Sequence, residues 1–406
     1  MMSTTTAQPP AATGSGIVAL LPIMAVVLVA FLVIGLALPV LPLHVHLGLE
    51  FSTFVVGLVT GSQFVASLLS RVWAGRFADS RGAKHAVVAG LLAAVAGGLL
   101  YLLSLRFVGA PSVSVTILIL GRALLGAAES FIITGGVSWG LALAGPANAG
   151  RVIAWVGMAM FAALALGAPL GTTLYAFGGF AAIAALTTLA PLAAIALVVP
   201  LAPVPPQRGT RPALLKVARV VWRPGFGSAL SSLGFGTMIA FSSLLSAERH
   251  WAPVWLLFSA FAAFLVAARL FLGHVPDRLG GARVALVSVV IEAAGLALIW
   301  LAPTQAVAAV GASLTGLGFA LVYPGLGIEA VRRAPPQSRG LAMGAYTAFL
   351  DVALGFGSPA LGLVAGWAGL GAVFLVSALV VLGAAGVALH LMRDNPPRGP
   401  ADRSAG

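Results

Sequence analysis

The sequence predicts an all-α membrane protein whose twelve transmembrane helices form two pseudo-symmetric six-helix bundles. Three observations predict this fold class: 60% of the 406 residues are hydrophobic, only 8% are charged, and long apolar runs recur along the chain. Soluble domains average about 45–50% apolar and about 25% charged residues, so a water-soluble fold would lack the polar residues to cover its surface. Intrinsic disorder is excluded as well, because it requires low hydrophobicity.

Each apolar run is long enough to cross a bilayer as a helix. A hydrocarbon core of about 30 Å needs about 20 residues at a rise of about 1.5 Å per residue. The high glycine content is expected of membrane helices that approach each other closely. In chain order, we expect spans at 17–43, 52–75, 84–105, 113–136, 152–176, 179–202, 225–247, 252–273, 283–302, 305–330, 340–366 and 370–392.

The two ends of the chain lie outside these spans. Residues 1–16 carry no Lys or Arg, and the apolar run that follows is too long for the core of a cleavable signal peptide. We therefore expect a flexible N-terminal tail over 1–16, a first helix that is retained, and a C-terminal tail over 394–406.

The positions of Lys and Arg indicate the orientation in the membrane. Nearly all of the 22 cations fall between spans on the side that carries both chain ends, and Lys and Arg are retained in the cytoplasm. We expect a multi-pass protein of a bacterial inner membrane with both termini in the cytoplasm and the lipid bilayer as a partner. The cations are not interleaved with exposed aromatic residues, so we expect no nucleic-acid partner.

A duplicated motif indicates that the chain consists of two halves. The pattern R-x3-G-x3-D-x2-G occurs at the end of the second span and again at the end of the eighth. The first copy consists of Arg71, Gly75, Asp79 and Gly82, with Lys84 following, and the second of Arg269, Gly273, Asp277 and Gly280, with Arg278 inside it.

A weaker repeat links Gly167-Ala-Pro169 in the fifth span to Gly357-Ser-Pro359 in the eleventh. We therefore expect an N-terminal bundle over 17–202, a C-terminal bundle over 225–393, and a cytoplasmic linker over 203–224 with a short amphipathic helix near 214–221. Two such halves, with a site between them near the bilayer midplane, are typical of transporters that open this site to each side in turn.

These motifs resemble those of the major facilitator superfamily over essentially the whole chain. Within it, the chain is similar to little-characterised bacterial permeases of the drug/proton antiporter and sugar-efflux-like grouping. Besides the duplicated loop, Arg122-Ala-Leu-Leu-Gly126 is similar to the family's R-x2-Q-G pattern, and Gly167-Ala-Pro169-Leu-Gly171 resembles the antiporter signature. The resemblance implies that the loop motif latches the two halves closed on the cytoplasmic side and opens during transport.

Arg122 and Glu129 are candidates for transport or coupling in the fourth span. A charge near the middle of a membrane costs at least about 2.5–3.5 kcal/mol, so Arg122 should face the cavity and have a partner. Glu129 lies two turns further along the same helix face. Arg122 could hold a substrate anion or tune Glu129 as a protonatable neighbour; the alternative is that both anchor neighbouring helices through hydrogen bonds.

Two further carboxyl groups, Asp351 in the eleventh span and Glu292 in the ninth, are coupling candidates. Apolar surroundings favour the neutral form of a carboxyl group, and exchange of its proton would couple transport to a proton gradient. The alternative for each is a neutral carboxyl group bonded to a neighbouring helix. Glu329 is expected to form an ion pair with Arg332 and Arg333.

Other residues are expected to shape the pathway. The first and fourth helices of each half usually line the pathway in this family, which gives Gly126, Phe235 and Tyr323 as lining candidates. Pro169 and Pro359 are expected to bend their helices, because proline removes an internal hydrogen bond.

Together these features predict a secondary active transporter that works by alternating access, with proton-coupled efflux of a small organic molecule or drug as the first hypothesis. The alternatives are a proton symporter that imports a sugar or an organic acid and, more remotely, a non-transporting membrane scaffold. The chain contains no Cys, no nucleotide-binding Gly-rich loop with Lys and no H-E-x-x-H motif. We therefore expect no enzyme, no catalytic residue, no cofactor and no metal, but a monomer whose partners are protons and a small-molecule substrate.

Overall fold

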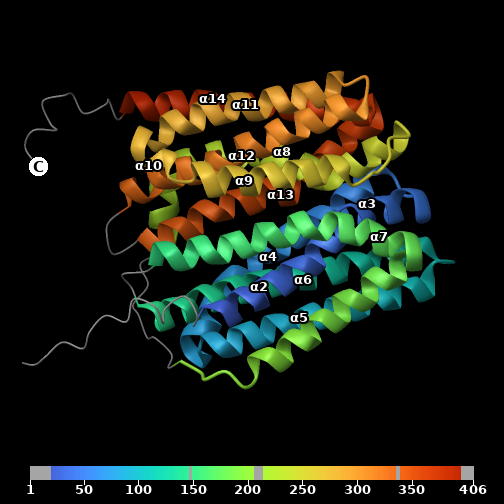
Figure 1. Ribbon diagram of the computed structural model, residues 1–406, viewed down its shortest axis with the longest axis horizontal. Coiled ribbons are helices and arrows are strands. Elements are labelled where there is room, and N and C mark those ends of the chain that lie inside the picture. Colours follow the sequence, from blue (N-terminus) through green and yellow to red (C-terminus); the bar gives the residue numbers. More distant parts are fainter. Residues whose placement is uncertain (1–19, 146–148, 205–213, 335–338, 395–406) are drawn as a thin grey trace, which may run out of the picture.

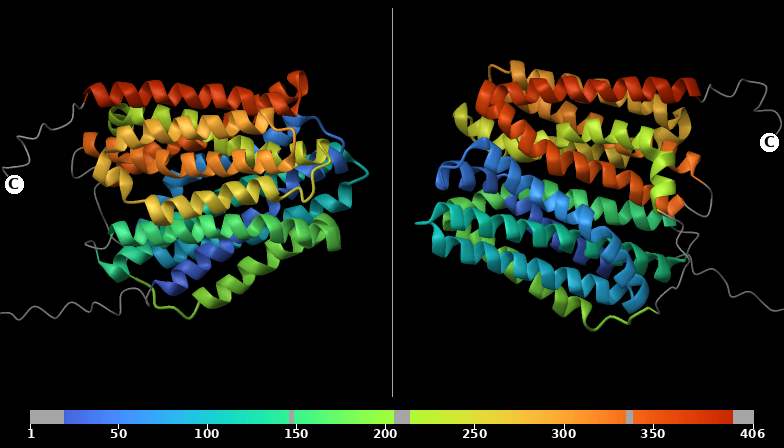
Figure 2. Two further views of the ribbon diagram at one scale, coloured as in Figure 1. Left: turned by 45° about the horizontal axis from the view of Figure 1, so that its top comes forward. Right: turned by 180° about the vertical axis from the view of Figure 1, so that it is seen from behind.

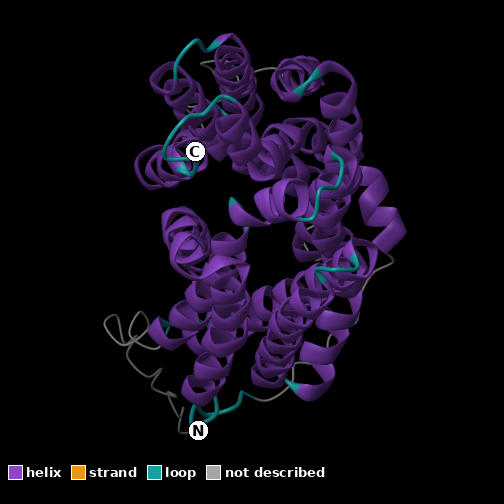
Figure 3. Ribbon diagram, turned by 90° about the vertical axis from the view of Figure 1, so that its right-hand side faces the viewer, coloured by secondary structure: helices purple, strands orange, loops and turns teal. Residues whose placement is uncertain are grey.

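The computed structural model describes residues 20–145, 149–204, 214–334 and 339–394. The expected N-terminal tail, the C-terminal tail beyond Asp394 and residues 205–213 of the expected linker lie outside these described residues. Within the described ranges every regular element is a helix (Figure 3). The predicted all-α class is therefore confirmed.

The helices of the first half begin with a span built from three segments. α2 (Leu21–Ala37) is followed by α3 (Val40–Leu43) and by η1 (His44–Gly48), a π-helical turn. The remaining elements of this half are α4 (Thr53–Arg81), α5 (Ala83–Ser104), the short η2 (Leu105–Phe107), α6 (Pro111–Ala144) and α7 (Ala149–Val198).

The second half has the same succession of long helices, with one short helix inserted at the position of the second motif copy. Its elements are α8 (Leu214–Glu248), α9 (Leu256–Leu272), the short α10 (Val275–Leu279), α11 (Gly281–Leu301), α12 (Gln305–Arg333), α13 (Arg339–Ala368) and α14 (Leu370–Asp394).

The helices account for twelve crossings within the described part of the chain. Ten are long and apolar enough to cross a membrane, and α9 is a shorter apolar helix. One of the ten, Trp155–Val198, has 44 residues, which would extend about 66 Å if straight and thus about twice the hydrocarbon thickness. It reverses at Gly179, whose φ of 60° departs from helical geometry, so α7 supplies the fifth and sixth spans.

Several helices run beyond the expected span ends. α4 continues from the expected end at 75 to Arg81, α6 ends at Ala144, and α8 begins at Leu214 and passes through Pro224. The segment expected as a separate amphipathic helix is thus the first part of α8. Hydropathy marks the hydrocarbon layer, whereas a helix satisfies its own backbone hydrogen bonds and can continue into the headgroup region.

The two halves lie side by side along their whole length. In Figure 1 the blue-to-green half (α2–α7) lies below the yellow-to-red half (α8–α14), and the two views of Figure 2 show the same separation. We call the side at which α2 begins and α14 ends the tail side, and the opposite side the far side. α10 lies on the tail side and α3 on the far side.

Contacts across the boundary follow the internal symmetry. α4, the second helix of the first half, packs against α13, the fifth of the second half. In the mirrored arrangement, α9, the second helix of the second half, packs against α7, which contains the fifth span of the first. The two bundles are therefore related as pseudo-symmetric copies, as predicted.

The α4–α13 contact is tightest toward the far side. A Cβ atom at Gly61 would collide with the carbonyl oxygen of Gly355, and Thr53 Oγ1 donates a hydrogen bond to the carbonyl oxygen of Gly362 at 2.7 Å. Small residues at these positions allow the two backbones to touch. The far-side ends of the two halves are thus packed directly against each other.

Gly61→Leu is expected to destabilise this contact, because overpacking a well-packed helix interface costs about 1–3 kcal/mol. Thermal unfolding of the purified protein in detergent, followed by tryptophan fluorescence, measures the loss. Gly386→Leu is the matched control, since Gly386 is exposed on α14 and a Cβ atom there meets no neighbour within 4 Å. Equal unfolding temperatures for both variants would contradict the contact.

Candidate functional site

An ion pair between the two halves lies near the middle of α13. Arg71 Nη2 on α4 and Asp351 Oδ2 on α13 are 2.5 Å apart. The Asp351 side chain is only 4% exposed, while that of Arg71 is 27% exposed. The pair therefore joins a carboxylate sealed within the protein to a guanidinium that remains accessible.

Glu129 extends this pair into a polar network inside the first half. Gln63 Nε2 on α4 donates a hydrogen bond to Glu129 Oε2 on α6 at 2.9 Å. The charges of Arg71 and Asp351 both act on Glu129. We call Gln63, Arg71, Glu129 and Asp351 the central network; it spans both halves through three helices.

Arg122 lies deeper in the first half than this network. The residue is 1% exposed, and its Nε and Nη1 atoms are buried without a hydrogen-bond partner. Its charge acts on Tyr101 of α5 and on Glu129. Tyr101 in turn packs on Phe180, with ring centroids 5.4 Å apart. Arg122 is therefore a buried cation near Tyr101, with Glu129 as its acidic neighbour.

Arg269, the first residue of the second motif copy, has different surroundings from Arg71. Its guanidinium carbon lies 4.0 Å from the ring centroid of Phe161 on α7. Its Nε atom is buried and has no hydrogen-bond partner. No carboxylate of the described residues forms an ion pair with it.

A pair of tyrosines lies near the two motif arginines. Tyr323 and Tyr346 have ring centroids 5.1 Å apart, and the Tyr346 hydroxyl donates to the Tyr323 carbonyl oxygen at 2.8 Å. The Tyr323 hydroxyl also shares a hydrogen bond of 2.6 Å with Thr347 Oγ1. The charges of Arg71 and Arg269 both act on Tyr323, so this tyrosine is near both guanidinium groups.

The last glycine of each motif copy makes a turn. Gly82 and Gly280 have φ of 96° and 92°, a region that side-chain-bearing residues rarely adopt. Lys84, just beyond the first turn, donates to the carbonyl oxygens of Val199 and Leu201 at 2.7 and 2.6 Å. It thus satisfies carbonyl groups at the end of α7, where a cation is also favoured by the helix dipole.

The remaining loop residues differ between the two copies. Gly75 is buried and Asp79 is half-buried in α4, whereas Gly273, Asp277 and Arg278 are exposed on the tail side. α9 ends at Leu272, just after the first residue of the second copy, while α4 continues to Arg81, just before the last glycine of the first copy. The motif is thus duplicated in sequence but not in its degree of burial.

Glu292 lies inside the second half and away from the central network. It is fully buried on α11 and accepts a hydrogen bond from Ser231 Oγ at 2.6 Å, while its Oε1 atom has no partner. Glu329 pairs with Arg332 and Arg333 at 3.3 and 3.0 Å, which confirms the ion pair expected for it.

The other candidates take up varied positions. Gly126 lies where α6 touches the backbone of Gln63 on α4. Phe235 stacks on Phe319 and Phe261 in an aromatic group within the second half. Pro169 and Pro359 lie inside α7 and α13.

Three contributors to the site were missed by the sequence analysis: Gln63, Phe161 and Tyr346. The amide of Gln63 is an isolated polar group in an apolar span, a signal that could have found it. Phe161 and Tyr346 give no such signal, because aromatic residues are common in buried helices.

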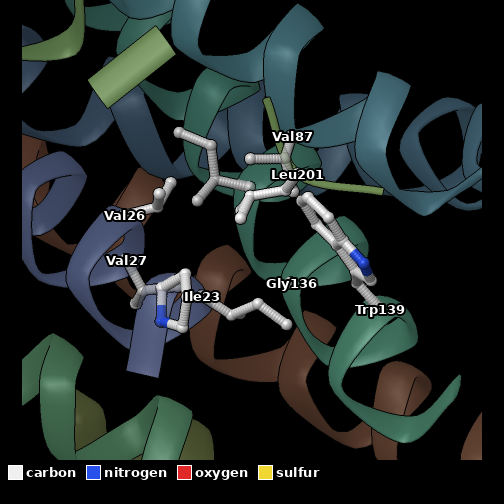
Figure 4. A pocket seen from close by; sticks show the side chains of 9 residues that line it. Ile23, Val26, Val27, Val87, Gly136, Trp139 and Leu201 are labelled. Carbon is white, nitrogen blue, oxygen red and sulfur yellow. The ribbon is translucent and has the colours of Figure 1, made fainter. Parts of the chain in front are cut away.

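An apolar hollow in the first half is separate from this site. It has no room for a water molecule and is lined by Pro22, Ile23, Val26, Val27, Val87, Ile132, Gly136, Trp139 and Leu201 (Figure 4). None of the central-network residues lines it. Within the described ranges, no three His, Asp or Glu side chains gather closely enough to hold a metal ion.

The twelve crossings, the two matched halves and the charged groups between them define a polytopic membrane transporter. Comparison with known proteins agrees: the profile of the Major Facilitator Superfamily matches residues 23–257 and 225–406. The chain therefore belongs to the Major Facilitator Superfamily.

Its relatives and structural neighbours are transporters as well. An uncharacterized MFS-type transporter of Salmonella typhimurium is 43% identical over 373 residues, which cover 92% of this chain and 96% of the relative. The crystal structure of a D-xylose–proton symporter has a TM-score of 0.75 at 13% identity and covers 91% of this chain and 96% of its own. The crystal structure of the human organic anion transporter MFSD10 has a TM-score of 0.67 at 15% identity. The match covers 94% of this chain and 100% of the MFSD10 chain.

Asp351→Asn is expected to destabilise the protein, because it leaves the Arg71 guanidinium without its partner. The cost should lie below about 3–5 kcal/mol, the value for a fully buried charge, since Arg71 is partly exposed. The double variant with Arg71→Met should lose less than the sum of the two single changes. Thermal unfolding of the four proteins measures the coupling. Additive losses would contradict an energetic link between the halves, and the exposed pair Arg223–Asp394 serves as the control cycle.

Proposed function

We propose that the protein is a secondary active transporter that works by alternating access and exports a small organic molecule in exchange for protons. The observation that carries this proposal is the Arg71–Asp351 pair between the halves. Because the partners belong to different bundles, movement of the bundles relative to each other must stretch or break the pair. A change in the charge of Asp351 would therefore act directly on the movement of the halves.

The coupling step follows from the electrostatics of this pair. An ionised Asp351 holds Arg71 across the boundary, and a protonated Asp351 loses most of this attraction. Glu129 is a second proton acceptor in the same network, since the charge of Arg71 also acts on it and Gln63 donates a hydrogen bond to it. We infer that protons move between Asp351 and Glu129 while Arg71 changes partner.

Positive charge supports the proposed orientation in the membrane. The tail side carries Arg76 and Arg81 on α4, Arg332 and Arg333 on α12, and Arg393 on α14. Because Lys and Arg are retained in the cytoplasm, we propose that the tail side faces the cytoplasm of a bacterial inner membrane. The closely packed far-side contact of α4 with α13 would in this orientation close the site toward the outside.

The tail-side loop motif has a place in the same cycle. We infer that the half-buried Asp79 belongs to a latch on the cytoplasmic side, whereas the exposed Asp277 and Arg278 contribute less to it. Lys84 supports the latch indirectly, because it fixes the end of α7 beside the turn at Gly82.

Export rather than import is proposed from the resemblance of the fifth-span motif to antiporters. The structural neighbours leave both directions open, since one is named a proton symporter for D-xylose and another an organic anion transporter. At 13–15% identity they share the fold with this chain. The experiment must therefore measure direction as well as coupling.

Asp351→Asn is expected to separate exchange from coupling. In proteoliposomes with an internal pH dye, the variant should lose substrate-driven proton movement by about tenfold or more, because the amide cannot carry a proton. Exchange of labelled substrate for unlabelled substrate should continue, since this step needs no net proton transfer.

Asp394→Asn provides the control, because this residue forms an exposed ion pair with Arg223 and lies at the end of α14. Unchanged proton movement in Asp351→Asn would remove this residue from the coupling mechanism. A proton flux in the same direction as the substrate would replace export by the symport alternative.

A further inference from the structure

The two pseudo-symmetric contacts between the halves differ at one position. Arg71 and Arg269 occupy the same place in the duplicated motif, and each reaches across the boundary to the fifth helix of the other half. Arg71 meets the carboxylate of Asp351, whereas Arg269 meets the ring of Phe161. The same scaffold thus contains one complete ion pair and one arginine without an acid.

Phe161 is the repeat counterpart of Asp351. The two GxP motifs align Pro169 with Pro359, and Phe161 precedes Pro169 by the same number of residues as Asp351 precedes Pro359. The helices that carry them, α7 and α13, make equivalent contacts with α9 and α4. The acid is therefore missing at the position where internal symmetry would place it.

The surroundings of Arg269 leave its charge uncompensated. Its described neighbours are the Phe161 ring and the hydroxyl-bearing Tyr323 and Tyr346, and its Nε atom is buried without a partner. An unpaired charge within a membrane protein is costly, and such residues mark substrate pathways. The residue as a whole is half-buried, so part of its surface is open to a small solute.

We propose that the anionic group of the transported substrate supplies the missing acid: the substrate is a small organic carboxylate bound by Arg269. Its apolar body lies against Phe161 and the Tyr323–Tyr346 pair, which offer aromatic surface next to the guanidinium. A carboxylate accepts hydrogen bonds from the Nη groups of a guanidinium, and these are the donors available on Arg269, since its Nε atom is buried. This inference rests on the proposed transport function and names the substrate class of the same site.

The chain allows a test in which the protein provides its own acid. Phe161→Asp places a carboxyl group at the symmetric counterpart of Asp351, where it should pair with Arg269 and occupy the site of the substrate. We expect this variant to unfold at a higher temperature than Phe161→Asn, which has the same size without the charge. An equal or lower unfolding temperature would overturn the inference.

Binding is measured on the purified full chain with benzoate, phenylacetate and hexanoate, and with the corresponding amides, through the shift in unfolding temperature with concentration. We expect at least one carboxylate to bind and every amide to fail. Arg269→Gln and Phe161→Asp should each weaken that binding by about tenfold or more. Binding of amides, no binding by any of the carboxylates, or undiminished binding by Arg269→Gln would overturn the inference.

Arg249→Gln is the matched control, since Arg249 also lies over an aromatic ring, that of Trp251, but is exposed on the far side. It should bind the carboxylate as the wild type does. The shift in unfolding temperature measures binding alone and is independent of proton coupling. Carboxylate binding without substrate-driven proton movement would contradict the proposed function but not this inference. Proton-coupled transport of amides would support the proposed function and contradict this inference.

Discussion

One ion pair between a buried carboxylate and a half-buried guanidinium joins the two halves of this protein near their centre. A carboxylate as buried as that of Asp351 needs a partner, since a lone charge there would cost several kcal/mol. The partner, Arg71, comes from the other half. The stability of the closed boundary and the charge of a single carboxyl group are therefore linked, and the proposed coupling of transport to protons depends on this link.

The duplicated architecture explains why the second arginine matters. The internal repeat gives both halves an arginine at the same position of the second helix. Only one of these arginines meets an acid on the fifth helix of the opposite half. The other meets Phe161, which packs against a guanidinium without neutralising its charge. One symmetric position thus serves the protein's own ion pair, and the other is left for a solute that carries the charge itself.

The fold was predictable because bilayer thickness fixes the length of every span. Composition and apolar run lengths were enough to place twelve helices, and the repeated motif was enough to divide them. Helix ends were less predictable: α8 begins inside the expected linker, because hydropathy marks the hydrocarbon boundary and not the last hydrogen-bonded turn.

The site was only partly predictable from the sequence. Charged residues in apolar spans drew attention to Asp351, Glu129 and Arg122, because each is costly in a membrane. The partners were not predictable, since Arg71 was assigned to the loop motif and its contact lies on a helix 280 residues away in the chain. The role of Phe161 depends on a three-dimensional juxtaposition that no local pattern records.

The most direct test of the link between the central charge and the movement of the halves is a distance measurement at the tail side. The chain has no cysteine, so spin labels can be attached at Ser80→Cys and Leu279→Cys, both at exposed positions. Double electron–electron resonance spectroscopy between the two labels then reports the separation of α4 and α10. We predict that the distance distribution shifts between low and high pH in the otherwise unchanged protein and becomes independent of pH in Asp351→Asn. The same pH-dependent shift in both proteins would contradict the account.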